Sequence, residues 1–350
     1  MCELFKKAEI KAIASILPSK EVDLEQLPIG DEKNKKKIIN TTGIKFIRKA
    51  KENRTTVDYC CEVGEYLLEN QKIDRELIDG IVFVSQTPDY IMPASSCLLQ
   101  NKLNLRKNLV AFDINYGCSG YVYGLFQAFL LIETGVCSNV LVFTGDTMTR
   151  HVNEKDRALM MVLGDAASVT LVGKADNDNL SMFSFYTDGA GYDKLIIPAG
   201  SNRIPIKKGV TDLLVEDEDG NSRSQENLYM NGLEIMTFSS SVVPKLIKNC
   251  LTKIDWDIRS LDKIFLHQPN KFIVNFIAKK LKLTEKEVPV YLEKIGNTGP
   301  ASIPLMLSGL YSNNSLEKVL LCGFGVGLSA ASLATTMKNA KILPILDSIE

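Results

Sequence analysis

The sequence predicts an α/β protein in which helices cover a parallel or mixed sheet. Strand-like apolar runs alternate with helical patterns through most of the 350 residues, an alternation typical of α/β folds. The composition, 45% hydrophobic and 24% charged residues, provides a large core and an ordinary polar surface. The clearest strand-like runs are 78–85, 108–115, 139–146, 261–268 and 318–325.

Two of these runs look like copies of two others. Residues 78–81 (IDGI) recur as 261–264 (LDKI), and residues 140–141 (VL) recur as 319–320. The similar spacing of the two matches indicates two related halves. We place the boundary between Lys174 and Asn179, which gives an N-terminal half of residues 1–175 and a C-terminal half of residues 176–350.

Two segments interrupt the alternation of strands and helices. Residues 201–227 are rich in Lys, Asp, Glu, Ser and Gly, which predicts an exposed loop early in the second half. Residues 187–205 carry Gly and Pro at both ends of a short apolar run, which predicts a strand and a loop rather than a helix.

The charge and hydropathy patterns disfavour several kinds of partner. A net charge of -1 gives no electrostatic footprint for nucleic acid, and we interpret the basic cluster of residues 33–37 as a solvated loop. No run of about 18 apolar residues predicts a membrane span. Residues 1–22 lack an apolar signal-peptide region and a small-residue cleavage site, so we expect a cytoplasmic protein.

The metal-ligating residue types are sparse or scattered. The only histidines are His151 and His267, so we expect no metal site built on histidine. The 8 cysteines show no CxxC spacing, and in a large intracellular chain we expect all of them to be reduced. His151 lies in the polar run TRHVNEKDR and is predicted to be a surface residue.

Cys118 is the first candidate for chemistry. It lies on the turn between the apolar strand 108–115 and a long helix over 119–134, which Gly135 ends. Nearly every helix position is apolar, aromatic or small, which predicts a helix buried on all sides. The helix dipole lowers the pKa of a thiol at this place and desolvation raises it, and the sequence leaves open which effect is larger.

His267 and Asn297 are candidate hydrogen-bond donors that would act together with Cys118. His267 ends the strand 261–268 just before Pro269, and the carboxyl ends of strands in α/β sheets face ligand crevices. Asn297 lies between Gly296 and Gly299, just before a helix, in a pattern that by itself predicts a turn with an N-cap. Together the three residues supply a covalent acyl carrier and two donors for a thioester oxygen.

Four motifs follow one another along the chain. They are CSGYVYGL with Cys118, HQPN with His267, GNTGPASIPL with Asn297, and GFGVGLS at residues 323–329. In order and spacing they resemble β-ketoacyl-ACP synthase III of the thiolase superfamily, and flanking segments such as TGIKFIR and GAGYDKLIIPAG extend the resemblance over essentially the whole chain. It implies a thiolase fold, a five-layered αβαβα arrangement of two duplicated βαβαβαββ halves.

The resemblance implies a decarboxylating condensation that makes a 3-oxoacyl-ACP. Cys118 attacks an acyl-CoA or acyl-ACP thioester, malonyl-ACP then loses carbon dioxide, and the carbanion attacks the acyl-cysteine. His267 and Asn297 donate to the enolate oxygen, and the backbone N–H groups of Cys118 and Val326 form the oxyanion hole for the acyl-cysteine. The implied substrates are an acyl-CoA and malonyl-ACP, with no permanently bound cofactor and no metal.

The resemblance also assigns binding residues. Arg157 matches a family arginine near the CoA nucleotide, and Asn270 and Lys271 are assigned to CoA or acyl carrier protein. Met92 matches a position that reaches across a homodimer into the partner's acyl pocket. Cys322 is expected to end a buried strand rather than act as a second catalytic cysteine.

Three positions depart from the family pattern. Lys37 and Thr41 stand where the family has a CoA-gripping tryptophan and arginine, and Phe272 stands where it has a basic residue. These changes predict a specialised paralogue with an unusual acyl donor, for which delivery on a carrier protein is one alternative to CoA.

Two other functions stay open at the level of sequence. The acyl group on Cys118 could pass to an oxygen or nitrogen nucleophile, although retention of both His267 and Asn297 argues against a simple transfer. Alternatively, the chain could be a non-catalytic partner that shapes the pocket of a condensing heterodimer, which an intact Cys118 opposes. The acyl chain length, the choice between CoA and ACP donors, and the pathway served are not determined by the sequence.

Overall fold

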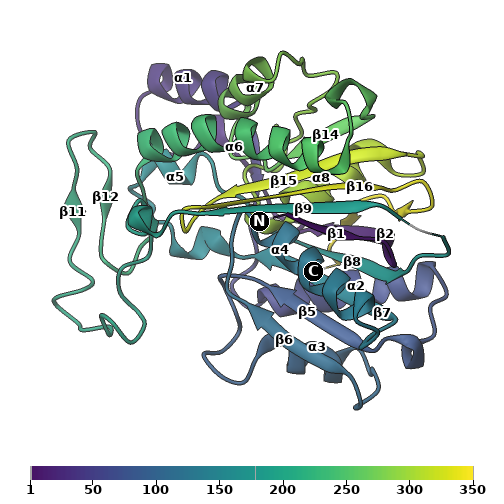
Figure 1. Ribbon diagram of the computed structural model, residues 1–350. Coiled ribbons are helices and arrows are strands. Elements are labelled where there is room, and N and C mark those ends of the chain that lie inside the picture. The colour runs from purple at the N-terminus through teal and green to yellow at the C-terminus, as the bar shows by residue number, and fades with distance from the viewer. Residues whose placement is uncertain (1, 178, 350) are drawn as a thin grey trace.

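The computed structural model describes residues 2–177 and 179–349 as two central sheets with helices between them and on both outer faces (Figure 1). From one face to the other the layers are helices, sheet, helices, sheet and helices. This is the five-layered αβαβα thiolase fold that the sequence predicts.

The first sheet is built mostly from the N-terminal part of the chain. In the order β17-β2-β8-β7-β5-β6, with β18 also beside β2, it runs through two C-terminal strands as well. Its strands are β2 (Ala8–Leu17), β5 (Gly80–Val84), β6 (Val110–Ile114), β7 (Asn139–Asp146), β8 (Ala166–Lys174), β17 (Lys341–Ile342) and β18 (Leu346–Asp347).

The second sheet is built mostly from the C-terminal part, in the order β1-β9-β16-β15-β14. Its edge strand β1 comes from the chain's beginning, so each sheet takes strands from both ends of the sequence. Its strands are β1 (Cys2–Phe5), β9 (Ser181–Thr187), β14 (Lys263–Leu266), β15 (Lys318–Gly325) and β16 (Ser329–Thr336).

The two sheets repeat one topology. The order β2-β8-β7-β5 in the first sheet matches β9-β16-β15-β14 in the second, with a parallel last pair and antiparallel pairs elsewhere. Asp79 accepts hydrogen bonds from the backbone N–H groups of Ser138 and Asn139, and Asp262 accepts them from Glu317 and Lys318. The recurring Asp therefore ties the beginnings of two neighbouring parallel strands together in both sheets.

The helices fill the three remaining layers (Figure 1). The middle layer is formed by α4 (Gly120–Glu133) and α8 (Ser302–Tyr311), which pack between the sheets. On the outer faces, α2 (Thr56–Asn70) and α3 (Ser95–Lys102) cover the first sheet, and α6 (Gly232–Ile254) and α7 (Lys271–Lys280) cover the second. Two further helices are α1 (Glu32–Thr42) and the single turn α5 (Arg157–Met160).

The remaining strands are short and lie outside the two main sheets, in three two-stranded pairs. They are β3 (Glu21–Asp23), β4 (Phe46–Arg48), β10 (Leu195–Ile196), β11 (Val215–Glu216), β12 (Ser222–Arg223) and β13 (Tyr229–Met230).

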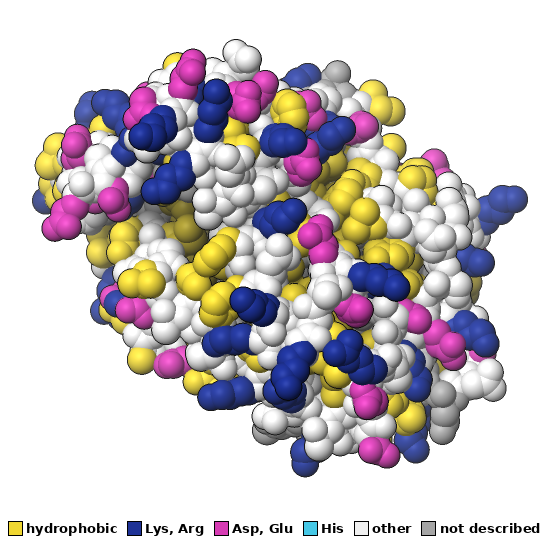
Figure 2. All heavy atoms as spheres, turned by 90° about the horizontal axis from the view of Figure 1, so that it is seen from above, with side chains coloured by type: hydrophobic (Ala, Val, Ile, Leu, Met, Phe, Trp, Pro, Cys, Tyr) yellow, Lys and Arg dark blue, Asp and Glu magenta, His cyan; other side chains and the backbone are white. Residues whose placement is uncertain are grey.

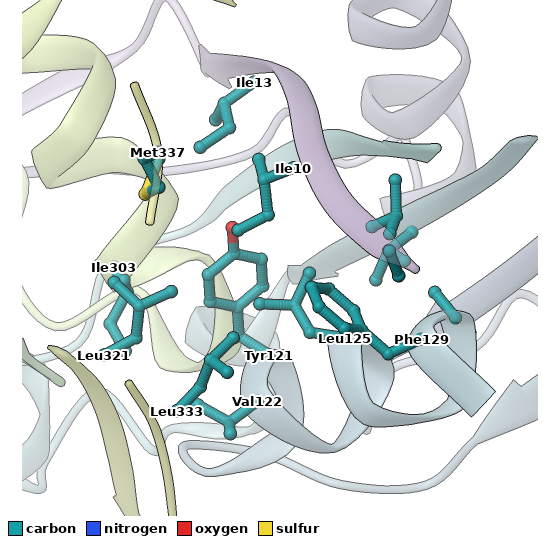
Figure 3. Close-up of a cluster of buried hydrophobic side chains, with 14 of the residues drawn as sticks. Ile10, Ile13, Tyr121, Val122, Leu125, Phe129, Ile303, Leu321, Leu333 and Met337 are labelled. Atoms are coloured by element: carbon teal, nitrogen blue, oxygen red, sulfur yellow. The ribbon is translucent and has the colours of Figure 1, made fainter. Parts of the chain in front are cut away.

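The largest core cluster lies between the sheets and is centred on α4 (Figure 3). Tyr121 and Leu125 point into it from the helix, and the Tyr121 hydroxyl contacts Thr170 Oγ1 at 3.0 Å. The prediction that α4 is buried on all sides is wrong, because Tyr123, Phe126 and further apolar residues of one face are only half-buried. On that face Tyr123 packs against Tyr116, which follows the edge strand β6, and Phe126 packs against Phe183 and Phe185 of β9.

The predicted exposed loop 201–227 is confirmed as a mostly exposed arm that carries the β11–β12 hairpin (Figure 1). Its base is held by Arg223, which pairs with the buried Asp156 at 2.8 Å and with Asp217 at 2.7 Å. The basic cluster 33–37, predicted to be a loop, instead lies on α1, because Asp31 caps that helix and Ile39 anchors it in the core. No helix among the described residues is long and apolar enough to cross a membrane.

Candidate active site

A cavity of about 1020 Å³ opens between the two halves of the fold, with Cys118 in its wall. Cys118, Asn297, Gly299, Val326 and Gly327 line one part of it. Other lining residues are largely apolar or aromatic, and they include Phe83, Tyr90, Ile91, Met148, Leu159, Leu163, Tyr192, Ile196, Ile197, Ile206, Leu228 and Met230. A cavity of this size and character suits a small-molecule acyl chain with a few polar groups at one end.

Cys118 lies two residues before α4, on the turn that follows β6. Burial raises the pKa of its thiol to about 11, and the charge of Asp146 acts in the same direction. Hydrogen bonds from the backbone N–H groups of Val326 and of Cys118 itself lower the pKa, but by less. Cys118 is half-buried, desolvation outweighs the favourable donors, and its side chain is a neutral thiol.

The Gly-rich segment 323–327 approaches Cys118 closely enough to exclude a side chain. A Cβ atom on Gly325 would lie 2.9 Å from both Cβ and Sγ of Cys118, and Gly325 has a φ of +152°. A Cβ atom on Gly323 would lie 2.6 Å from the Cys118 carbonyl oxygen. Glycine at these places lets the backbone N–H of Val326 reach the sulfur.

In the Gly325→Ala variant we expect the rate of Cys118 acylation to fall at least tenfold, because the added methyl group meets Sγ. The free energy of unfolding should fall by about 1–3 kcal/mol, because an alanine is strained at this positive φ. Intact-protein mass spectrometry and urea unfolding measure the two effects. Gly209→Ala is the matched control, since Gly209 also has a positive φ of +74° but nothing lies within 4 Å of its Cβ position. Equal acylation of the two variants would contradict the close approach.

His267 follows β14 and is buried, with 1% of its surface exposed. Its Nδ1 contacts Ser302 Oγ at 2.7 Å, and its ring meets Phe324 edge to face. Burial lowers the pKa of His267 to about 3, and a backbone hydrogen bond with Gly299 opposes this only in part. The imidazole is therefore neutral at physiological pH.

His267 should make the protein sensitive to acid. Between its native pKa of about 3 and its ordinary value of 6.5, the unfolded chain binds a proton that the native chain does not. The unfolding free energy is therefore lost as pH falls through this window, by up to a few kcal/mol. The test is urea unfolding of wild type and of His267→Asn from pH 4 to 7. The difference between their unfolding free energies should rise with pH, with a slope that approaches about 1.4 kcal/mol per pH unit.

The control for this measurement is His151→Asn, because His151 is only half-buried and burial lowers its pKa less completely. Its difference slope should be smaller than that of His267→Asn. Parallel curves for wild type and His267→Asn would contradict a buried neutral imidazole.

Asn297 is fixed by its own backbone and by its side-chain oxygen. Its N–H donates to Val162, its carbonyl accepts from Gly164, and its Oδ1 accepts from the Gly299 N–H at 3.0 Å. This last bond assigns the amide orientation, because an N–H cannot donate to Nδ2. Nδ2 has no acceptor among the described residues and is left as the donor at the cavity wall.

The structure thus brings Cys118, Asn297 and Val326 to one cavity, and it places His267 just behind the wall rather than in it. The predicted binding residues lie elsewhere. Asn270 caps α7 through the Ile273 N–H, and Lys271 faces Glu285 at 3.8 Å and lines a smaller cavity near α1.

The other two predicted contact residues lie outside the lining of the large cavity. The guanidinium of Arg157 donates to the backbone carbonyl of Asp219 in the arm. Met92 is 81% exposed and follows Ile91, which is 98% exposed. Both positions are on the molecule's surface rather than at the reacting centre.

The sequence interpretation missed three residues of this region. His151 is half-buried and lines the cavity, so its prediction as a surface residue is wrong. Its backbone carbonyl accepts a hydrogen bond from the Leu228 N–H, which holds this segment under the base of the arm. Ser302 orients His267, and its only signal in the sequence is its position in the motif GNTGPASIPL that carries Asn297. Asp146 is a buried carboxyl group in the cavity wall, signalled by an acid that ends an apolar strand.

The remaining thiols and acids form no second centre. Cys322 is buried within β15, as predicted, and burial raises its pKa well above the ordinary value. No disulfide joins the cysteines whose side chains the structure describes. Over residues 2–177 and 179–349, no group of three or more His, Cys, Asp or Glu side chains is arranged to hold a metal.

Comparison with known proteins identifies the family. The 3-oxoacyl-[acyl-carrier-protein (ACP)] synthase III family model matches residues 112–189, and its C-terminal counterpart matches residues 251–337. The β-ketoacyl-[acyl-carrier-protein] synthase III of Caldanaerobacter subterraneus is 32% identical over 95% of this chain and 98% of the relative. The chain belongs to the 3-oxoacyl-[acyl-carrier-protein] synthase III family.

Further 3-oxoacyl-[acyl-carrier-protein] synthase III relatives agree along the whole chain. The Clostridioides difficile β-ketoacyl-[acyl-carrier-protein] synthase III is 31% identical over 92% of this chain and 96% of the relative. The crystal structure of a Burkholderia xenovorans 3-oxoacyl-(acyl-carrier protein) synthase has a TM-score of 0.93 at 33% identity and covers 99% of both chains. The predicted family, fold and enzyme class, a condensing acyltransferase, are confirmed.

Proposed function

We propose that the enzyme joins an acyl thioester to malonyl-ACP through an acyl-Cys118 intermediate. The observation that carries this proposal is the meeting of Cys118, the Asn297 amide and the Val326 N–H at one end of one largely apolar cavity. The cavity accepts the acyl chain, and the polar end is where the thioester carbonyl reacts. Nucleophile and donors come from the chain itself, so the chemistry requires no resident cofactor.

The first step is acyl transfer to sulfur. Cys118 Sγ attacks the donor's thioester carbon, its proton passes to the departing thiolate, and the carbon–sulfur bond to the donor breaks. The N–H groups of Cys118 and Val326 hold the negative oxygen of the tetrahedral intermediate. That both groups already donate toward Sγ supports this assignment.

The second step is decarboxylation followed by carbon–carbon bond formation. Carbon dioxide leaves malonyl-ACP, and its bonding pair forms an enolate. The enolate carbon attacks the acyl-cysteine, the carbon–sulfur bond to Cys118 breaks, and the released thiolate takes a proton from solvent to restore the resting thiol. We assign the enolate oxygen to Asn297 Nδ2 at the cavity wall, with His267 Nε2 as the second donor from behind it. Neutral donors suit this role because they stabilise the new charge without a proton transfer.

The donor is the least determined part of the reaction. Position 272 carries an exposed phenylalanine, and Arg157 is engaged by the arm through Asp219. Few cationic groups are therefore free for a nucleotide at those positions, which supports a donor carried by acyl carrier protein. Lys271 is exposed, and its 3.8 Å pair with Glu285 is weak enough to yield to a phosphopantetheine phosphate.

The carrier's docking face is assigned to the side of the molecule that carries α1, α6 and α7. Lysine and arginine side chains are spread over it among acidic ones, with apolar side chains exposed between them (Figure 2). The exposed lysines of α1 and α7 belong to this side, and they include Lys33, Lys36, Lys37, Lys271, Lys279 and Lys280.

We also propose a homodimer formed along β6. Among the described strands, β6 pairs only with β5, so one row of its backbone groups has no strand partner. The half-buried Tyr123 of α4 packs against Tyr116, which follows β6, and the exposed Ile91 and Met92 belong to the same half of the chain. A second copy at this edge would cover these side chains and bring Met92 to the partner's cavity.

The required thiol at Cys118 supports a reducing compartment, and we assign the enzyme to the cytoplasm. Acyl thioesters and acyl carrier protein are the partners in that compartment. Neither nucleic acid nor membrane has a part in the reaction.

The direct test is intact-protein mass spectrometry with a panel of acyl-CoA and acyl-ACP donors, followed by malonyl-ACP. We expect a mass increase that maps to Cys118, then release of carbon dioxide and appearance of 3-oxoacyl-ACP. Discharge of the acyl group to an alcohol or amine, with malonyl-ACP ignored, would instead establish a plain acyltransferase. Absence of any acylation would establish a non-catalytic partner.

A further inference from the structure

Asp146 is a buried carboxyl group that the proposed mechanism leaves without a role. It ends β7, next to the parallel strand β5, and only 3% of its surface is exposed. It lines the large cavity together with Cys118, Asn297 and Gly299. Charged side chains are rarely this buried unless they are bonded or functional.

The two carboxyl oxygens of Asp146 have different surroundings. Oδ1 accepts hydrogen bonds from Gln86 N at 2.7 Å, from Ser85 Oγ at 2.9 Å and from Thr87 Oγ1 at 3.2 Å. Oδ2 receives none from the described residues and faces Gly299, where a Cβ atom would lie 3.1 Å from it. A proton on this group therefore belongs on Oδ2, beside the turn that carries Asn297.

Burial raises the pKa of Asp146 to about 7, although hydrogen bonds from the Gln86 N–H, the Ser85 hydroxyl, and the hydroxyl and N–H of Thr87 oppose the shift. Its charge acts on two thiols, Cys118 at the β6–α4 turn and Cys60 on α2, and raises the pKa of both. The end of β5 offers Asp146 hydroxyl and amide groups, and β8 places Ala166 opposite it. The carboxyl groups on these packed segments are the buried Asp165, which precedes Ala166, and Asp89, which follows Thr87 by two residues, and neither is among the causes of the Asp146 shift. His267, behind the Gly299 turn, is neutral.

We propose that Asp146 is a positioning residue that sets the charge of the condensing site. As a neutral acid it ties the Ser85–Thr87 segment to β7 and supports the Gly299 turn without placing charge in the cavity. When Oδ2 releases its proton to solvent, the carboxylate opposes a thiolate at Cys118 and an enolate at Asn297. The enolate part rests on the proposed function, and the thiol part does not.

The thiol part is tested by alkylation of Cys118 with iodoacetamide from pH 6 to 11, followed by peptide mass spectrometry. Asp146→Asn keeps an oxygen for the three donors and removes the charge, so we expect the apparent pKa of Cys118 to fall by at least about half a unit. The matched control is Asp113→Asn, because Asp113 lines the same cavity and accepts from Ser95 N and Ser96 N, but does not shift the Cys118 pKa. Superimposable profiles for wild type and Asp146→Asn would overturn the proposal.

A second variant keeps the test valid if Asp146→Asn does not fold. Ser85→Ala removes one hydrogen-bond donor to the Asp146 carboxylate, so Asp146 should ionise at a higher pH. The pH at which the condensation rate falls should then rise by the same amount. In single-turnover condensation of pre-acylated enzyme with malonyl-ACP, we expect the wild-type rate to fall about tenfold as pH rises through 7 to 8.5. A rate independent of pH in wild type would overturn the charge-setting role even if acylation of Cys118 proceeds normally.

Discussion

The Cys118→Ala variant should lose acyl transfer and condensation by more than about 10³-fold, because no other described nucleophile lies beside the Val326 N–H. It should still decarboxylate malonyl-ACP, since the donors assigned to the enolate, Asn297 and His267, are untouched. Mass spectrometry of the donor-treated protein and release of labelled carbon dioxide measure the two activities separately. The variant should fold normally, because a thiol is replaced by a slightly smaller apolar group.

Cys97→Ala is the matched control for this experiment, because Cys97 is an exposed thiol on α3 outside the cavity lining. It should take up the acyl group as wild type does. Persistent acylation of the Cys118→Ala protein at a single site would show that another residue is the acyl carrier, and the proposed mechanism would fail. Loss of decarboxylation together with acylation would separate the enolate site from Asn297 and His267.

The second large effect is expected at Asn297. In the Asn297→Ala variant the enolate loses its donor at the cavity wall, which should slow decarboxylation and condensation by about 10²–10³-fold. Acylation of Cys118 should continue, because its oxyanion is held by backbone N–H groups. Single-turnover measurements of acylation and of carbon dioxide release give the two rates.

Asn297→Asp separates the donor role of Asn297 from its role in the turn. The carboxylate keeps an acceptor for the Gly299 N–H, so the turn and the thermal midpoint should be preserved. It replaces the Nδ2 donor with a negative oxygen, so condensation should fall at least as far as in Asn297→Ala. An active Asn297→Asp enzyme would mean that Asn297 serves only the turn.

The sequence predicted the strands that carry a strong apolar signal. The predicted runs 139–146 and 318–325 are β7 and β15 without change, and the other three are one or two residues shorter at their ends. Both unchanged strands are central and buried, and each carries a continuous apolar run, residues 140–143 in β7 and 319–322 in β15. The copied Asp at 79 and 262 proved to be a repeated structural device rather than a coincidence.

The sequence failed where exposure depends on distant segments. Both the half-buried face of α4 and the position of His151 in the cavity wall depend on contacts between segments that are distant in the sequence and meet only in the folded chain. The helix that carries Lys33 and Lys37 was missed because its polar residues hide a short apolar face around Ile39. No local pattern records such packing.

The sequence by itself determined the family and the fold, and it selected Cys118, His267 and Asn297 as the candidate reactive side chains, because each motif depends on residue types that only a narrow chemistry requires. Tertiary structure alone decided how those groups are tuned. Burial raises the pKa of Cys118 and that of Asp146, the latter to about 7, and it lowers the pKa of His267. These shifts arise from desolvation by segments distant in the sequence, and a carboxyl group fixed between Gln86 and Gly299 cannot be inferred until β5, β7 and the Asn297 turn have met.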